Sequence, residues 1–198
     1  MHTPRLTQKK SLPLRKFGGF TLVETLVAIV VITFAVIGPY QIVQGVLQTA
    51  FKSRDQIMAS ALAQEGMEYV REVRDSNYLY NARGGGVNWL NGLDGTNGPN
   101  CYTSACVVDS HYYPPTARFV AGSSITSCGN STCASQPLYL NSSSYRYNQQ
   151  NVGTKTKFVR KVQLTQISTT ETLVTVTVTW DNHGIQTVKL EEYLQNWL

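Results

Sequence analysis

Residues 15–38, RKFGGFTLVETLVAIVVITFAVIG, hold the features that decide the fold of this chain. A basic segment leads into Gly18-Gly19, and a long apolar run follows that carries one carboxylate, Glu24. At about 1.5 Å per helical residue, about 20 apolar residues span the roughly 30 Å hydrocarbon core of a bilayer. The length of the run favours a helix over a buried strand, despite its many Val and Ile residues. The sequence therefore predicts a transmembrane helix over residues 20–43.

The excess positive charge of the chain lies entirely ahead of this run. The sequence has 17 Lys and Arg against 12 Asp and Glu, a net charge of +5, and the excess comes from Arg5, Lys9, Lys10, Arg15 and Lys16. Basic residues beside a membrane helix stay on the cytoplasmic side, so we expect the chain after the helix to lie outside. The chain after residue 19 is neutral, and its charge does not indicate nucleic-acid binding.

A secretory signal peptide shares the basic start and the apolar run. Its cleavage site is a small-x-small pattern that follows the run, and Gly38-Pro39-Tyr40 fits that pattern poorly. In this chain the small residues precede the run instead. The order of features therefore argues against a conventional secretory signal.

The segment from Gly19 to Glu24 resembles the prepilin class III signal of type IV pilins and of type II secretion pseudopilins. The resemblance implies that a prepilin peptidase removes a cytoplasmic leader, residues 1–19, and that Phe20 becomes N-methylated. It also implies partners: other pilin or pseudopilin subunits, an inner-membrane assembly platform and the lipid bilayer. Glu24 would align subunits by pairing with a neighbour's Phe20 amine; the alternative is that it only snorkels to the cytoplasmic headgroups.

The helix is expected to continue beyond the membrane to about residue 80. Gly38-Pro39 predicts a kink or a local opening. Residues 44–80 form an imperfectly amphipathic helix, in which Arg71 would pair with Glu68 or Asp75 and lie on the far side from the apolar stripe. The stripe consists of Val43, Leu47, Phe51, Met58, Leu62, Tyr69 and Val73. Residues 62–77 also resemble the minor pilin V and pseudopilin I branch.

Residues 81–153 are rich in Gly, Ser, Asn, Thr and Tyr and predict a loop-rich insertion. It contains two C-x4-C pairs, and an extracytoplasmic location favours disulfides over a four-cysteine zinc site. Three pairings are open, and we prefer the two local bridges, Cys101 with Cys106 and Cys128 with Cys133. Residues 91–98 lack the order of a calcium loop and read as a turn cluster, so we expect neither a metal nor another cofactor.

Residues 154–198 return to regular structure and predict an antiparallel meander. Strands are expected at 158–167, 172–180 and 185–194, with a turn at 181–184, and another strand or hairpin at 119–120 or 138–147. The amphipathic part of the helix would cover the apolar face of this sheet. The fold class is therefore α+β, a pilin-like ladle, with Trp197 expected in the core; the alternative is that Trp197 makes an exposed contact.

Catalytic motifs are not apparent in the sequence. Asp109, Ser110 and His111 are adjacent, and adjacent side chains cannot form a catalytic relay; His183 falls in a predicted turn. We therefore expect a structural protein of the cytoplasmic membrane, a minor type IV pilin that later enters an extracytoplasmic pilus. The alternatives are a type II secretion pseudopilin, a membrane-anchored binding protein and, least favoured, an anchored enzyme.

Overall fold

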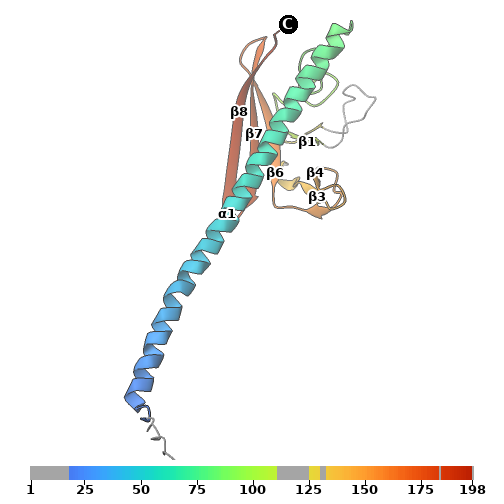
Figure 1. Ribbon diagram of the computed structural model, residues 1–198. Helices are drawn as coiled ribbons and strands as arrows, with labels where there is room; N and C mark the ends of the chain where they lie inside the picture. Colours follow the sequence, from blue (N-terminus) through green and yellow to red (C-terminus); the bar gives the residue numbers. More distant parts are fainter. Residues whose placement is uncertain (1–17, 111–124, 130–132, 183, 198) are drawn as a thin grey trace, which may run out of the picture. The chain divides into compact units, whose positions relative to one another are not determined.

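The computed structural model describes residues 18–110, 125–129, 133–182 and 184–197. The chain divides into two compact units, one ending at Thr49 and one from Ala50 to Leu198. The described part of the first unit is helical apart from its first few residues, whereas the second unit combines helix with two antiparallel sheets (Figure 1). The predicted α+β class is confirmed.

Helix α1, Leu22–Ala82, has 61 residues and contributes to both units. Its helical backbone continues through Gly38 and Pro39, so the predicted local opening is not found there. The helix ends where Gly84 adopts a φ of +89°, a left-handed conformation that glycine adopts without strain. Asn81 then fixes the exit of the chain, because its side-chain amide donates to the carbonyl of Val87 and accepts from its N–H.

The larger sheet of the second unit has the strand order β2-β1-β6-β7-β8, with every pair antiparallel. The three predicted C-terminal strands are confirmed, and Asp181 pairs with Ile185 across the predicted turn. Residue 183 lies outside the described residues. The strands are β1 Cys106–Val108, β2 Ile125–Ser127, β6 Val159–Gln166, β7 Glu171–Asp181 and β8 Ile185–Gln195.

The insertion at 81–153 contains more regular structure than its composition predicts. It supplies β1 and β2 to the larger sheet and most of a smaller sheet of order β4-β3-β5. The hairpin predicted within 138–147 is present there, whereas residues 119–120 lie outside the described residues. The remaining elements are β3 Tyr139–Asn141, β4 Arg146–Asn148, β5 Thr154–Lys155 and the 3₁₀ turn Cys133–Ser135.

The core of the second unit lies between α1 and the larger sheet. Alternate residues of β7 are buried, as expected for a strand with one covered face. Gly66 lets the helix approach closely, because a Cβ there would lie 3.0 Å from both Arg160 Cδ and Val176 Cγ1. The buried helix residues are Ala59, Leu62, Ala63, Met67, Tyr69, Val70 and Val73.

Two details of the predicted packing are wrong. Trp197 is 71 % exposed, because its ring stacks beneath the guanidinium of Arg74, 4.6 Å from the ring centroid, instead of entering the core. Arg71 does not point away from the sheet: it pairs with Glu68, as predicted, and with Glu192 on β8. The carboxylate of Asp75 pairs with Arg74.

Candidate functional site

The predicted cleavage position lies in open, non-helical backbone directly before α1. Gly18, Gly19 and Phe20 are exposed and precede the first helical residue, Leu22. A Cβ added at Gly18 or Gly19 would meet no atom within 4 Å, and neither glycine has a positive φ. Nothing in the fold of the described residues therefore requires glycine at these positions. The peptide bond between Gly19 and Phe20 joins two exposed residues outside the helix.

Thr21 directly precedes the helix and caps its first turn, a role that was not predicted from the sequence. Its hydroxyl accepts a hydrogen bond from the N–H of Glu24 at 3.3 Å, which satisfies one of the free donors of the first turn. The spacing Thr21-x-x-Glu24 is that of a capping box, a signal that was available in the sequence. Glu24 also lies in the first turn, where the helix dipole favours a carboxylate.

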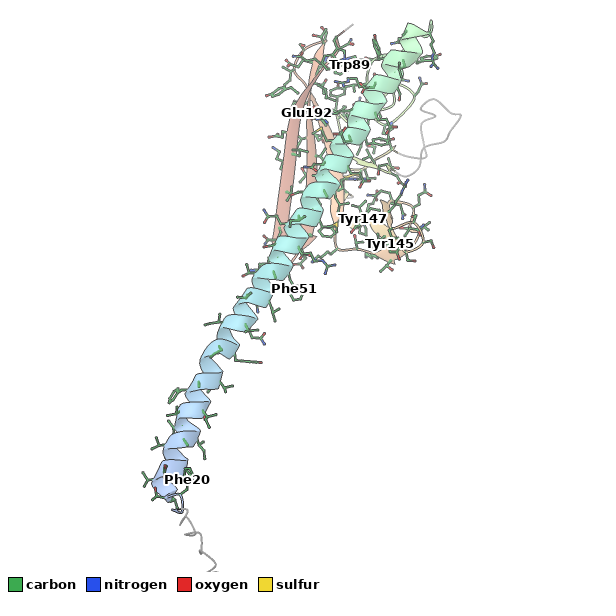
Figure 2. The ribbon with its side chains drawn as sticks, in the orientation of Figure 1. Phe20, Phe51, Trp89, Tyr145, Tyr147 and Glu192 are labelled. Atoms are coloured by element: carbon green, nitrogen blue, oxygen red, sulfur yellow. A yellow bond between two sulfur atoms is a disulfide. The ribbon has the colours of Figure 1, made fainter. Side chains whose placement is uncertain are left out.

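The helix of the first unit presents an entirely exposed apolar surface. Of its described side chains, none is buried within the chain (Figure 2). The most apolar window of α1 has a mean hydropathy of 2.3, and α1 is the one helix among the described residues that is long and apolar enough to cross a membrane. The threonine hydroxyls of this helix are hydrogen-bonded within it, since Thr25, Thr33 and Thr49 each donate to a carbonyl of the preceding turn. This surface requires an apolar environment, either lipid or another helix.

Residues 14–38 match the prokaryotic N-terminal methylation motif. The matched segment contains Gly19, Phe20 and Glu24 together with the apolar run that follows them. The match supports a protein of the type IV pilin and pseudopilin kind that a prepilin peptidase processes, and the apolar helix fits a protein anchored in the inner membrane. Such a motif points to a structural subunit. Comparison with curated proteins and with solved structures gave no significant match.

Two disulfides lie within the insertion, Cys101–Cys106 and Cys128–Cys133, which is the pairing preferred from the spacing. The first is fixed to the larger sheet, because the N–H of Leu164 on β6 donates to the carbonyl of Cys101 at 2.9 Å. The N–H of Cys128 donates to the carbonyl of Ala105 at 2.7 Å. The bridges therefore hold the insertion against the strands.

The described residues offer no metal centre. They contain no group of three or more His, Cys, Asp or Glu side chains placed to share an ion. The segment 91–98 is a turn cluster, in which the N–H of Gly92 donates to the carbonyl of Thr96 at 2.9 Å and Asp94 accepts from the N–H of Thr96. Asp94 thus stabilises its own turn.

The adjacent Asp109 and Ser110 are engaged separately. Asp109 is buried and accepts from the N–H of Gln149, whereas the hydroxyl of Ser110 donates to Glu65 on α1. His111 lies outside the described residues. The two side chains serve different contacts, as expected for structural positions.

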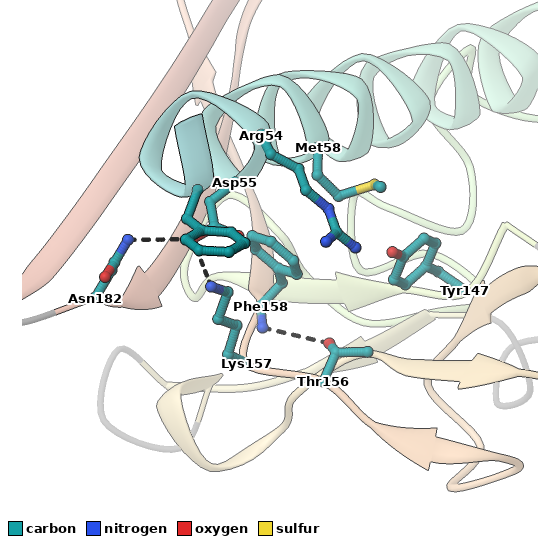
Figure 3. Close-up of a pocket in the computed structure, with 9 residues that line it drawn as sticks. Arg54, Asp55, Met58, Tyr147, Thr156, Lys157, Phe158 and Asn182 are labelled. Atoms are coloured by element: carbon teal, nitrogen blue, oxygen red, sulfur yellow. Dashed lines mark hydrogen bonds and ion pairs between the residues drawn. The ribbon is translucent and has the colours of Figure 1, made fainter. Parts of the chain in front are cut away.

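A pocket of about 420 Å³ lies at the start of the second unit; we call it the entry pocket (Figure 3). Asp55 lines the pocket and accepts hydrogen bonds from Lys157 Nζ at 2.5 Å and from Asn182 Nδ2 at 3.1 Å. Arg54 extends over the pocket toward Tyr147. The pocket thus combines two cations with apolar and aromatic walls, and its residues come from parts of the chain that no linear motif connects.

Arg160 is the other charged centre of the second unit. It is fully buried and donates to the carbonyls of Leu62 and Val108 at 3.1 and 3.0 Å, while its Nε has no hydrogen-bond partner among the described residues. Burial lowers the pKa of Arg160, and the carboxylate of Glu65, 3.5 Å away, opposes that effect. Its contacts join α1 to β6 and β1, which is a structural role.

Proposed function

We propose that the protein is a minor type IV pilin, a structural subunit that prepilin peptidase processes and that enters a pilus or its priming complex through its N-terminal helix. The observation that carries this proposal is the methylation motif at residues 14–38, placed directly at the start of an exposed apolar helix. The only charged side chain of that helix before Lys52 is Glu24. An apolar surface of this length needs lipid before assembly and neighbouring helices after it.

The basic residues of the leader support a cytoplasmic N-terminus, with the second unit outside. The peptidase would cut the exposed bond between Gly19 and Phe20 on the cytoplasmic side of the membrane. Methylation of the new amino terminus leaves it charged. The two disulfides suit an oxidising extracytoplasmic compartment.

Assembly would depend on Glu24 and the Phe20 amine of a neighbouring subunit. A carboxylate within the apolar zone costs about 3 kcal/mol on insertion scales at the bilayer centre and less near the interface, so a cationic partner stabilises it. Pairing would set the axial position of one helix against the next, while the apolar side chains of residues 20–49 pack together. The Thr21 cap holds Glu24 at the first turn, where such a partner can reach it.

The test is the N-terminus of the protein extracted from membranes of cells that have prepilin peptidase. We expect a mature chain that begins at N-methyl-Phe20 by mass spectrometry. Gly19→Val should block processing, whereas the matched Gly18→Val should not, because the fold gives both glycines the same open surroundings. A chain that keeps Met1, or that is cut after the apolar run, would overturn the proposal.

A type II secretion pseudopilin is the alternative, because the same motif serves both kinds of protein. Deleting the gene separates the two: loss of pili supports the minor pilin, and loss of a secreted protein with normal pili supports the pseudopilin. If the chain is a static anchored binding protein, the deletion should change neither the pili nor the secreted protein. The resemblance of residues 62–77 to the minor pilin V and pseudopilin I branch belongs to this proposal as well.

A further inference from the structure

Three segments meet at the end of the second unit that the chain enters after Thr49, and we call this region the entry end. Asp55 connects them, because it accepts from Lys157 and from Asn182. Asp181 pairs with Ile185 in the adjacent turn. The segments are residues 51–58 of α1, residues 155–158 before β6 and the turn at 181–185.

The entry end presents positive charge to solvent. Arg54 is exposed, and its guanidinium has no ion-pair partner among the described residues. Asp55 is only 14 % exposed and is already engaged by Lys157 and Asn182. The cations here are Lys52, Arg54, Lys155 and Lys157, against the acids Asp55 and Asp181. Because the chain after residue 19 is neutral overall, this is a local excess.

Large apolar side chains are exposed beside these cations. Phe51 is 60 % exposed and lines the entry pocket, and Ile185 in the neighbouring turn is 81 % exposed. Single exposed apolar residues are common on protein surfaces. An aromatic ring and an aliphatic chain among Lys and Arg side chains, however, are typical of surfaces that lie at a membrane interface.

The uncharged part of the helix is long enough to put the entry end at the level of the outer lipid headgroups. Thr25 to Phe51 contain no charged residue, and about 27 helical residues span about 40 Å. A bilayer is about 40–45 Å thick when its headgroups are included. If Glu24 lies at the cytoplasmic interface, Lys52 and Arg54 follow at the level of the outer headgroups. The level of Lys52 and Arg54 follows from the length of the helix alone, so it does not depend on the orientation of the second unit.

We propose that the entry pocket binds the phosphate of an outer-leaflet phospholipid while the protein is stored in the membrane. Arg54 supplies the planar donors that match a phosphate, and Lys157 keeps two of its three ammonium donors after binding Asp55. Phe51 and Ile185 lie in the interface beside it. This inference rests on the proposed function and adds that the second unit docks on the bilayer, a contact that must break before the subunit enters a filament.

The test uses the full mature chain in vesicles of phosphatidylcholine with phosphatidylglycerol. A single cysteine replaces Ile185 and carries a fluorophore; Ser168→Cys, in the turn at the other end of β6, is the control, and Ala35→Cys reports insertion of the helix. Quenchers attached to lipid headgroups report proximity to the outer surface. We expect strong quenching at position 185, little at 168, and a label at 35 that only acyl-chain quenchers reach.

The cations should control this docking. Because one basic residue near an anionic surface is worth roughly a fivefold change in binding, Arg54→Gln and Lys157→Gln should each lower the docked-to-undocked ratio by about that factor. High salt should have the same effect. The matched Lys189→Gln removes an exposed charge in the middle of β8 and should change nothing.

The outcomes separate the two proposals. A label at 35 outside the acyl chains contradicts membrane anchoring, and with it the proposed function. A label at 35 inside the acyl chains with equal quenching at 185 and 168 overturns lipid binding alone, as does quenching that Arg54→Gln and Lys157→Gln leave unchanged. Quenching at 185 could also fall when the protein is diluted with lipid. That result would overturn lipid binding and show that the entry pocket binds an acidic segment of a second copy.

Discussion

Arg160 of β6 donates a hydrogen bond over 3.1 Å to the carbonyl oxygen of Leu62 of α1, inside the core of the second unit. The same guanidinium donates to Val108 of β1 at 3.0 Å, so one side chain joins a helix and two strands. Arginine stays charged when buried, and the two backbone carbonyls together with Glu65 offset much of the cost of burying this cation. The position of α1 on the sheet thus depends partly on a polar contact within an apolar core.

Replacing Arg160 by Met should lower the free energy of unfolding by about 2–4 kcal/mol. The change leaves the carbonyl of Val108 without its side-chain donor and leaves Glu65 without its cation, although Glu65 is partly exposed and can be hydrated. Urea unfolding of the full chain in detergent measures the loss. Lys161→Met, on the opposite face of the same strand, is the control and should change the value by less than about 0.5 kcal/mol. Equal effects of the two variants would contradict the role given to Arg160.

We expect the folded protein to lose stability at high pH because of the partly buried hydroxyl of Tyr102. Its hydroxyl shares a hydrogen bond of 2.7 Å with Thr172, and burial raises its pKa above the usual 10.0. Because the folded state holds this proton more tightly, the stabilisation is complete below the unfolded pKa and is lost as the pH rises through the folded pKa. Tyr102→Phe should cost about 1 kcal/mol at pH 7 and flatten the decline above about pH 10.

The measurement for Tyr102 is the urea midpoint between pH 7 and 11. Tyr193→Phe serves as its control, because it removes the same hydroxyl from a side chain that is 60 % exposed. An unchanged alkaline decline in Tyr102→Phe would assign the decline to other groups.

The strands of the meander were predictable because their signal is local. The predicted ranges 158–167, 172–180 and 185–194 agree with β6, β7 and β8 to within one residue at each end. The strands of the insertion have three residues each, too few for periodicity, and β1 depends on contacts that are distant in sequence, because it pairs with β6 and contains Cys106 of the first disulfide. Arg160 did carry a signal, since it shares strand parity with the buried Val162 and Leu164.

The two candidate sites also differ in how well the sequence alone predicts them. Gly19, Phe20 and Glu24 form a linear motif, so residue order alone identifies the segment that matches the methylation motif. The entry pocket brings Arg54, Lys157 and Asn182 together from distant parts of the chain. Only the fold of the second unit shows that they are neighbours.

The two disulfides close loops of equal length, with a sequence separation of 5 in each. Chain entropy therefore assigns about 2 kcal/mol to both. Their surroundings differ, because Cys101 and Cys106 belong to the main core, whereas Cys128 and Cys133 form a separate small buried cluster with Ala105 and Val107. Replacing the first pair by Ser should cost more, since it also buries two hydroxyls in the main core. Urea unfolding of the two double variants makes the comparison, and a larger loss for the second pair would contradict it.

Glu24 contributes a first-turn carboxylate to the helix start and a charge that would pair with a neighbouring subunit. Two substitutions separate these roles. Gln at this position retains the capping-box pattern with Thr21 but removes the charge, whereas Leu removes both. Neither change makes membrane insertion less favourable, so both variants should be inserted and processed. If charge pairing with a neighbour's Phe20 amine drives assembly, Glu24→Gln and Glu24→Leu should both reduce the filament-to-membrane ratio of the protein by roughly tenfold or more. Quantitative immunoblotting of sheared filaments and membranes measures this ratio, with Glu72→Gln, an exposed acid of the second unit, as the control. A loss in Glu24→Leu alone would show that the helix start matters and the charge does not, and wild-type incorporation of both would remove Glu24 from assembly.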